Sequence, residues 1–332
     1  MVTSVPAVVV PKLARHPLST LPTPLVEARR LTQAVGGPPI HVKRDDLAGF
    51  AVAGHKARQL EFLMGSALDR GCDVIVTGGG ASSNFCAAAA AAAAVAGIDC
   101  HLVLSGSGGG PPHPSLALAR ACGATVSYTG DPDRSSADAG VLRKADALAA
   151  GGRRPFAMPR GGATGLGTVG MVVAAQELGD QLDRAGIDAA TVVVATGSGG
   201  AAAGLALGAA LGGRSWRVVG ASVSRPVPEM EDQVRMLADE CAALLGVVPP
   251  PDLGLELVDA RGPGFGLPSP AGDTAAGLAL RTEGLVLDPV YTAKALAVLL
   301  RGPDRDPDHP AVFWHTGGLL AAAHHLAAGH GR

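Results

Sequence analysis

Aromatic residues are scarce in this sequence, at 3% of 332 residues, and neither sign of charge dominates, since the formal net charge is −2. So few aromatic side chains give no surface on which nucleic-acid bases would stack. A net charge near zero gives no long-range field that attracts nucleic acid or an anionic membrane. We therefore expect neither of these as a partner.

Long hydrophobic runs are missing as well. Near the start, a short apolar run is interrupted by Pro6 and Pro11, and it lacks the basic segment of a signal peptide. The other apolar stretches contain glycines or charges within a membrane-spanning length. The sequence thus predicts no signal peptide and no transmembrane helix.

Cysteine is also rare and shows no organised spacing. The five cysteines form neither a CxxC motif nor a cysteine–histidine pattern typical of metal ligands: Cys72, Cys86, Cys100, Cys122 and Cys241. An odd, scattered set in a chain of this length is typical of reduced thiols in a cytoplasm. We expect a cytoplasmic protein without a metal site.

The chain does contain an alternation of short apolar strands and helical patterns. Runs rich in β-branched residues predict buried parallel strands at 73–79, 101–106, 125–130, 191–197 and 216–223. Helical patterns occupy 56–71, 115–123, 138–152, 167–186 and 201–213. The alanine-rich stretch 87–94 predicts a tightly packed helix, because alanine has the highest helix propensity. Together they predict an α/β architecture of parallel sheets with flanking helices.

The length of the chain favours two domains. The Gly- and Pro-rich segment 155–167 is a plausible crossing between them, and a second loop-rich region spans residues 246–273.

The segment Gly197 to Gly200 is a glycine loop between a predicted strand and a predicted helix. Its backbone amides and the helix dipole favour an anion, so the loop is a candidate phosphate site. A plain glycine-rich turn is the simpler alternative. The loop also fits a dinucleotide fingerprint, but that reading needs an acid at the end of the next strand, and residues 217–224 end in serines.

Three further segments carry reactive side chains. Lys56 starts a predicted helix, where the dipole disfavours an ammonium and lowers the pKa of the amine. An exposed lysine at a helix start is the commoner case. Ser83 and Asn84 start another helix, where capping alone explains them. Tyr291 and Thr316 lie in segments that packing alone also explains.

Taken together, these segments resemble one family closely. The matching blocks follow in order along the chain: KRDD, GHKARQLE, GGASSN, PRGGATGLGTVG, TGSGG, GPGFGLP, EGLVLDPVYTAK and HTGG. In order and spacing they are similar to the fold type II (tryptophan synthase β-like) pyridoxal-phosphate enzymes of the D-cysteine desulfhydrase and 1-aminocyclopropane-1-carboxylate deaminase group. The resemblance implies a two-domain fold, with residues 1–55 and 165–332 as the large cofactor-binding domain and 56–164 as the small domain. It also implies a homodimer.

The resemblance assigns roles to matching positions. Lys56 is implied to be the Schiff-base lysine of pyridoxal 5′-phosphate, and Asn84 to contact the ring oxygen of the cofactor. Ser83 and Tyr291 are implied to act on the substrate as acid–base or carboxylate-binding groups. The remaining implied contacts are to the phosphate, from Gly197, Ser198, Gly199 and Gly200, and to the pyridine nitrogen, from Thr292 or Thr316.

Departures from the family pattern concern the substrate side. Phe85 and Phe265 stand where polar or tyrosine side chains are usual, and Ala201 replaces a common threonine. In the deaminases the position of Thr292 holds an acid that pairs with the pyridine nitrogen. A neutral partner weakens the electron sink. We therefore expect no native ring-opening of the cyclopropane substrate, and we expect activity on bulkier or less polar β-substituted amino acids.

Three hypotheses follow for function. The first is a pyridoxal-phosphate-dependent lyase that eliminates a β substituent from a small amino acid, giving a keto acid and ammonia, with β-replacement in secondary metabolism as a variant. The second is an NAD-dependent oxidoreductase that uses the same glycine loop. The third is an inactive protein of this fold that serves as a binding module.

Overall fold

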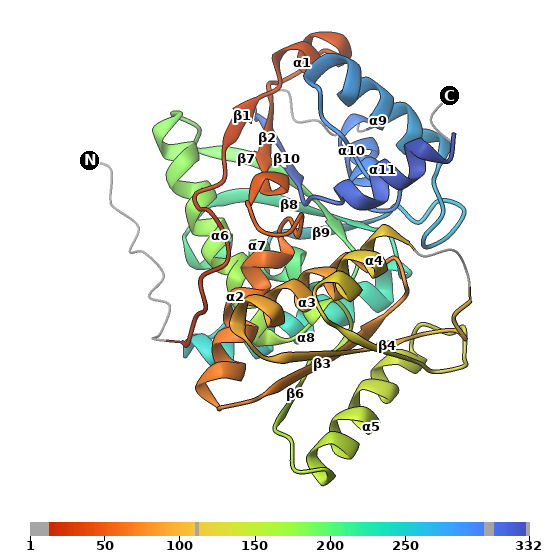
Figure 1. Ribbon diagram of the computed structural model, residues 1–332. Helices are drawn as coiled ribbons and strands as arrows, with labels where there is room; N and C mark the ends of the chain where they lie inside the picture. Colours follow the sequence, from red (N-terminus) through yellow and green to blue (C-terminus); the bar gives the residue numbers. More distant parts are fainter. Residues whose placement is uncertain (1–12, 110–112, 302–308, 330–332) are drawn as a thin grey trace.

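A computed structural model of the chain describes residues 13–109, 113–301 and 309–329, and its strands form two sheets (Figure 1). The larger sheet has the strand order β1 (Leu25–Glu27), β2 (Ile40–Arg44), β10 (Ala311–His315), β7 (Ala189–Thr196), β8 (Ser215–Ser222) and β9 (Leu255–Asp259). Strand β1 pairs antiparallel with β2, and every other pair in this sheet is parallel.

The smaller sheet is entirely parallel. Its strand order is β5 (Thr125–Tyr128), β4 (Asp99–Leu104), β3 (Val74–Gly79) and β6 (Pro155–Ala157). The predicted strands and the α/β class are confirmed. Strand β6 lies inside the segment 155–167 that we predicted as a crossing between domains, so the first three residues of that segment belong to the smaller sheet. Three residues are too few to show a strand pattern in the sequence.

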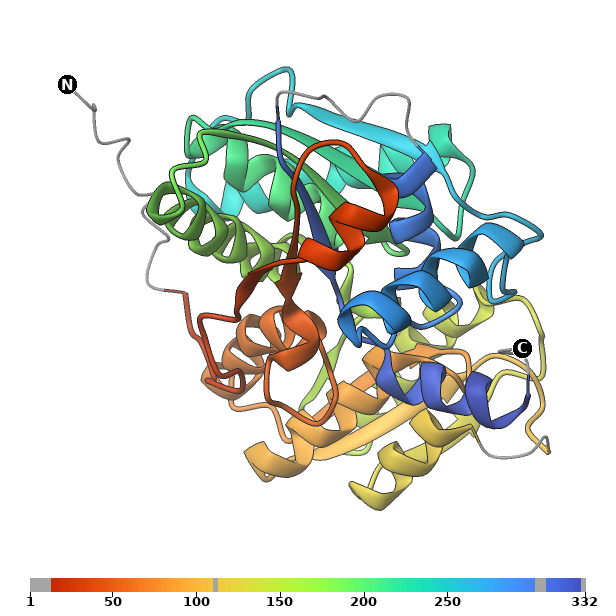
Figure 2. The ribbon, with the colours of Figure 1, turned by 90° about the horizontal axis from the view of Figure 1, so that it is seen from above.

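Helices cover both sheets, as Figures 1 and 2 show from two directions. The helices that match predicted patterns are α2 (Lys56–Asp69), α3 (Asn84–Ala96), α4 (Pro114–Ala121), α5 (Ser136–Ala150), α6 (Gly165–Arg184) and α7 (Gly200–Leu211). The alanines from Ala87 to Ala93 are buried in α3, which confirms the packed helix. Because alanine is small, α3 lies close to its neighbours α2 and α4.

Several elements were not assigned from the sequence: β1, β2, β6, β9 and β10, and the helices α1 (Arg29–Val35), α8 (Val227–Leu245), α9 (Pro270–Glu283), α10 (Thr292–Arg301) and α11 (Leu319–Ala327). Strand β9 lies within the region that the sequence presents as loop-rich. Its residues are half-buried or exposed at the edge of the sheet, so they carry no continuous apolar run.

Helix α2 is fixed to the large sheet by buried ionic contacts. The Arg58 guanidinium donates to Asp45 Oδ1 at 2.8 Å and to Glu177 Oε2 at 3.0 Å. Trp314 Nε1 on β10 donates to Asp45 Oδ2 at 2.9 Å. A Cβ on Gly170 of α6 would lie 2.3 Å from the Arg58 carbonyl oxygen, so α2 and α6 approach as closely as only glycine allows. The start of α2 is therefore held rigidly.

The two sheets divide the chain along the lines of the expected domains. All strands of the smaller sheet fall within residues 56–164, and all strands of the larger sheet fall outside that range. Helix α2 packs against α6 as well as α3, so it contacts both parts. The domain boundaries themselves remain a prediction.

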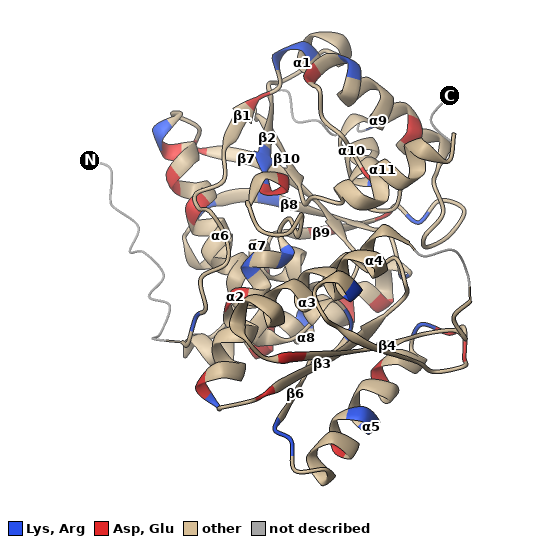
Figure 3. Ribbon diagram, viewed as in Figure 1, with Lys and Arg blue, Asp and Glu red and all other residues tan. Residues whose placement is uncertain are grey.

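Figure 3 shows Lys and Arg interspersed with Asp and Glu over both halves of the molecule. Among the helices within residues 13–109, 113–301 and 309–329, none combines the length and apolar content that a bilayer crossing requires.

Candidate active site

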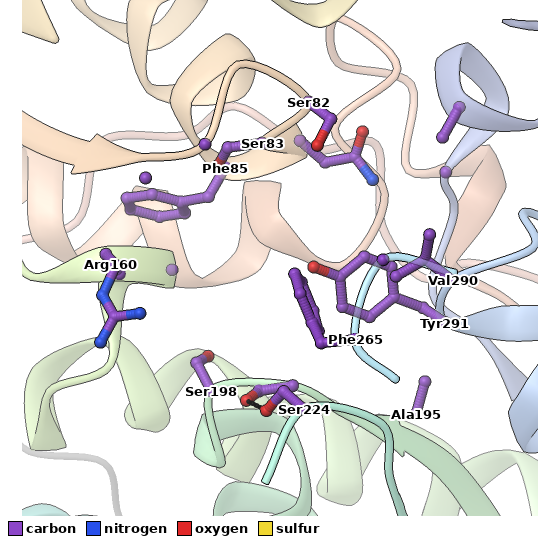
Figure 4. Close-up of a pocket in the computed structure, with 18 of the residues that line it drawn as sticks. Ser82, Ser83, Phe85, Arg160, Ala195, Ser198, Ser224, Phe265, Val290 and Tyr291 are labelled. Carbon is purple, nitrogen blue, oxygen red and sulfur yellow. Dashed lines mark hydrogen bonds between the residues drawn. The ribbon is translucent and has the colours of Figure 1, made fainter. Parts of the chain in front are cut away.

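A cavity of about 980 Å³ lies where the carboxyl ends of strands from both sheets meet. Loops after β3, β7 and β10 and the first residues of α2, α3 and α7 line it. Parallel strands gather their carboxyl-end loops at one edge, and open α/β sheets bind ligands there. Figure 4 shows side chains from both parts of the chain facing this space.

Lys56 is the first residue of α2 and lines the cavity. Its Nζ donates to Gln59 Oε1 at 3.0 Å and to the Gly161 carbonyl at 3.3 Å, and it lies 5.8 Å from the centre of the Phe85 ring. Neither hydrogen-bond partner is a carboxylate. Burial lowers the pKa of the Lys56 amine to about 8. About one tenth of this amine is therefore uncharged at pH 7, far more than for an ordinary lysine.

The loop before Lys56 docks onto the end of β10. His55 N and Nδ1 both lie 3.1 Å from the Thr316 carbonyl oxygen. A Cβ on Gly54 would lie 2.0 Å from the same oxygen, and the φ of Gly54 is +59°. Burial and the neighbouring Lys56 lower the pKa of His55 to about 3, so this imidazole stays neutral. The contact fixes where Lys56 enters the cavity.

The glycine loop between β7 and α7 presents backbone to the cavity. Helix α7 begins at Gly200, and its cap Gly199 has φ +93° and no side-chain capping bond. A Cβ on Gly199 would lie 3.1 Å from both Gln233 Cγ and Leu237 Cδ1, and one on Gly197 would lie 2.9 Å from Tyr291 Cε1. The loop holds no room for larger residues, and the amides at the start of α7 are left for a ligand.

The start of α3 forms the facing wall of the cavity. Ser83 is its N-cap, and the Ser83 hydroxyl accepts a hydrogen bond from Cys86 N at 3.2 Å. Asn84 is the first residue of the helix and also lines the cavity. Capping, the simpler interpretation from the sequence, is thus real for Ser83. It does not prevent the positive end of the helix from binding an anion.

Tyr291 lies in the turn before α10 and reaches the cavity, with Phe265 packed edge-on at 6.1 Å between ring centres. Burial raises the pKa of Tyr291 to about 12, so the phenol stays protonated. The turn is held by the buried carboxylate of Asp288, which accepts from Tyr291 N at 2.7 Å and from the Thr292 hydroxyl at 2.7 Å.

The two threonines assigned to the pyridine nitrogen occupy different places. Thr316 lines the cavity, and within the described residues its hydroxyl has no hydrogen-bond partner. Thr292 is fully buried, its hydroxyl is bonded to Asp288, and it does not line the cavity. Thr316 therefore fits the assignment, whereas Thr292 supports the turn that carries Tyr291.

Sequence reasoning missed several groups around Lys56. Gln59 lies one helical turn after it, and its buried Nε2 has no hydrogen-bond partner among the described residues. Gly161, with φ +70°, brings its carbonyl to Lys56, and a Cβ there would lie 2.9 Å from Ser198 Oγ. The i to i+3 spacing of Lys56 and Gln59 on a helix is a signal that was available. The contact with Gly161 spans 105 positions and gives no local signal.

Comparison with known protein families gives one match over most of the chain. The model described as "Pyridoxal-phosphate dependent enzyme" matches residues 17–317. The chain is 35% identical over 325 residues to the D-cysteine desulfhydrase of Salmonella paratyphi B, which covers 93% of this chain and 95% of that protein. The D-cysteine desulfhydrase of Salmonella newport matches with the same identity and coverage.

Solved structures are similar in fold. The crystal structure of an ACC deaminase homologue superposes with a TM-score of 0.88 and 32% identity, covering 96% of this chain and 95% of that one. A pyridoxal 5′-phosphate-dependent aspartate racemase superposes with a TM-score of 0.65 at 17% identity, covering 89% of this chain and 90% of that one, which is a likeness of fold alone.

Proposed function

The chain belongs to the family of pyridoxal-phosphate-dependent enzymes, and we propose that it is a lyase that removes the β substituent of a small amino acid, giving a keto acid and ammonia. The observation that carries the proposal is the Lys56 amine, which is free of any carboxylate and faces the same cavity as the glycine loop. The relatives named as D-cysteine desulfhydrases, similar over 93% of the chain, support this reaction class.

The cavity fits the cofactor. An uncapped helix start at Gly200, with glycines too tightly packed to carry side chains, suits a phosphate. The unpartnered hydroxyl of Thr316 is available to the pyridine nitrogen, and Asn84 to the ring oxygen. We assign the phosphate to Gly197, Ser198, Gly199 and Gly200, and the aldehyde to Lys56.

Lys56 has two tasks in this proposal. Its amine, with a pKa of about 8, is uncharged often enough to bond the aldehyde of the cofactor. With the cofactor and a substrate in the cavity, the free Lys56 amine would also be placed to take the α-proton. When bound, pyridoxal phosphate supplies an electron sink that stabilises negative charge at the substrate α-carbon.

Ser83 and Tyr291 are assigned to the substrate. The N-terminus of α3 favours the α-carboxylate through its free amides and its dipole. The Tyr291 phenol, with a pKa near 12, serves as a hydrogen-bond donor or acid and not as a base at neutral pH. These roles orient the α-proton toward Lys56.

The residue that contacts the pyridine nitrogen of the cofactor bears on which reaction the protein catalyses. Thr316 is neutral, so the expected partner of the nitrogen carries no charge, although it is a different residue from Thr292. A neutral partner keeps the ring less often protonated, which suits loss of a good leaving group. We therefore retain the proposal that opening of the cyclopropane ring is not the native reaction.

The nicotinamide-dependent alternative is set aside, because the family match spans the glycine loop on which that alternative rested. The alternative of an inactive binding module predicts no turnover of any amino acid, which the experiment below measures. β-Replacement remains a variant of the same chemistry and differs only in the fate of the β-carbon.

The experiment is a panel of β-substituted amino acids, each as both enantiomers, with detection of keto acid and ammonia. We expect keto acid and ammonia in equal amounts from at least one member, and their loss in Lys56→Ala. A holoenzyme that releases neither product from any member would contradict a lyase.

We further propose that the protein acts as a homodimer in the cytoplasm, as the family resemblance implies, with small amino acids as its only ligands besides the cofactor. Light scattering of the holoenzyme checks the dimer: a mass near twice the 32.9 kDa of the chain is expected, and a monomeric mass would contradict it.

A further inference from the structure

Three arginines from separate loops meet at the cavity: Arg134 before α5, Arg160 after β6, and Arg225 before α8. All three line the cavity and are partly buried. Burial lowers the pKa of Arg134, and the neighbouring Arg160 and Arg225 lower it further. Gathering like charges in a partly desolvated site costs free energy unless an anion joins them.

The guanidinium groups of Arg134 and Arg160 keep hydrogen-bond donors that no described residue uses. Asp138 accepts from Arg160 Nε at 2.7 Å and from its backbone N at 3.1 Å, which leaves the two Nη groups of Arg160 without a partner among the described residues. The Arg134 guanidinium has neither an ion pair nor a hydrogen bond among the described residues. Asp133, Asp138 and Glu229 lie near the three arginines, but in the described chain only Asp138 is hydrogen-bonded to one of them, so several guanidinium N–H groups stay available to a ligand.

Arg134 is held in place by an aromatic ring. Its guanidinium carbon lies 3.5 Å from the centre of the Phe265 ring, and Phe265 in turn packs edge-on against Tyr291. At this separation the planar guanidinium lies against the ring face, so its N–H groups point sideways and remain free to bind. Phe265 thus orients a cation beside the residue assigned to the substrate.

The cofactor phosphate already has its own site. Of the three arginines, only Arg225 contacts the glycine loop, through Nη1 and the Gly197 carbonyl at 3.4 Å. Arg134 has no contact with that loop, and Arg160 is paired with Asp138. In Figure 4, Arg160 lies on one side of the cavity, with Phe265 and Tyr291 across from it. The cavity therefore has open space between Arg160 and the pair formed by Phe265 and Tyr291.

We propose that Arg134 and Arg160 form a subsite for an acidic group on the substrate side chain, so that the preferred amino acids carry a negative charge beyond the α-carbon. This inference rests on the proposed lyase function and names its substrate class. The α-carboxylate goes to the start of α3, and the second acid accepts hydrogen bonds from the two guanidinium groups. It also revises the expectation that Phe85 and Phe265 select less polar substrates, because Phe265 orients a cation.

The test is equilibrium binding of aspartate and asparagine to the holoenzyme, as both enantiomers, by calorimetry. The two ligands have nearly the same shape, differ in charge, and lack a β leaving group. The wild type is expected to bind aspartate about tenfold more tightly than asparagine. Arg134→Gln and Arg160→Gln should each remove most of this preference, and Arg134→Lys should keep part of it.

Arg143→Gln is the matched control, because Arg143 is an exposed arginine on α5 outside the cavity. It should keep the full preference. Equal binding of aspartate and asparagine by the wild type would overturn the subsite. A loss of cofactor from Arg134→Gln with an unchanged preference would also overturn it, by placing that arginine at the phosphate.

Failure of the subsite and failure of the lyase assignment are separable. Turnover of neutral β-substituted amino acids without any preference for aspartate contradicts the subsite alone. A preference for aspartate without turnover of any amino acid contradicts the lyase alone.

Discussion

The two walls of the cavity are built from different material. The wall on the large sheet includes two stretches of tightly fixed backbone, the loop at Gly197–Gly200 and the turn held by Asp288. The wall on the small sheet presents side chains, including Ser83, Arg134 and Arg160. A cofactor common to a family needs a fixed cradle, whereas a substrate is distinguished by exchangeable side chains. We therefore expect the wall on the large sheet to determine which cofactor binds, and the wall on the small sheet to determine which substrate binds.

Removing the amine of Lys56, which lies between the two walls, should have the largest effect on turnover. Lys56→Ala is expected to lower turnover by about a thousandfold or more, because it removes both the bond to the cofactor and the nearest base. The protein should stay folded, since α2 is held by Arg58 rather than by Lys56. Steady-state kinetics and circular dichroism check this, with Lys144→Ala as a control that should behave as wild type.

The second largest effect is expected from a substitution in the glycine loop of the large-sheet wall. Gly199→Asp is expected to weaken cofactor affinity by about a hundredfold or more, because it adds a negative charge beside the proposed phosphate site and a Cβ that would crowd Gln233 and Leu237. Gly186→Asp is matched for positive φ but has nothing within 4 Å of its Cβ. The control should lose a little stability and no cofactor. Undiminished affinity in Gly199→Asp would show that the phosphate lies elsewhere.

Tyr291→Phe tests where the two walls meet. We expect kcat to fall about a hundredfold with the cofactor still bound, because the protonated phenol is lost while the ring that packs on Phe265 remains. The control is Tyr128→Phe. Tyr128 is the other of the two tyrosines and lies on β5 of the small sheet, so this change should leave kcat unchanged. Wild-type kcat in Tyr291→Phe would reduce Tyr291 to a packing residue.

The pH dependence of cofactor loading should follow Lys56. Its pKa is lowered by burial to about 8, and only the uncharged amine bonds an aldehyde. Below about pH 8 the rate of cofactor incorporation should rise about tenfold per pH unit, and it should level off above that value. Stopped-flow absorbance on cofactor-free protein measures this. A rate that keeps rising to about pH 10 would mean that the amine is not desolvated.

The smallest effects should separate the two threonines. Thr316→Val is expected to change the absorption spectrum of the bound cofactor and lower kcat a few-fold, with stability unchanged. Thr292→Val should lower the free energy of unfolding by about 1–3 kcal/mol, because it leaves the buried Asp288 with one donor fewer, and should leave the spectrum unchanged. A changed cofactor spectrum in Thr292→Val and an unchanged one in Thr316→Val would indicate that Thr292 contacts the pyridine nitrogen.

The backbone wall was readable from the sequence because glycine loops between strand and helix have a local signature. The five predicted strands and the packed helix α3 were also predictable, because the residues that form each of them lie in one continuous stretch of the sequence. The side-chain wall was not readable. Arg134 and Arg160 come from separate loops, and no local spacing brings them together or places Arg134 against Phe265 of the other wall. The short β6 and the edge strand β9 lacked an apolar run, and Thr292 was indistinguishable from Thr316 without burial.

The central claim is that Lys56 is the lysine that bonds pyridoxal phosphate. Borohydride reduction of the holoenzyme, followed by proteolysis and mass spectrometry, tests it directly. The pyridoxyl group is expected on the peptide that contains Lys56. Lys43 and Lys294 are bonded to protein oxygens away from the cavity, so they should remain unmodified. A pyridoxyl group on either of them, or on Lys12 or Lys144, would contradict the account.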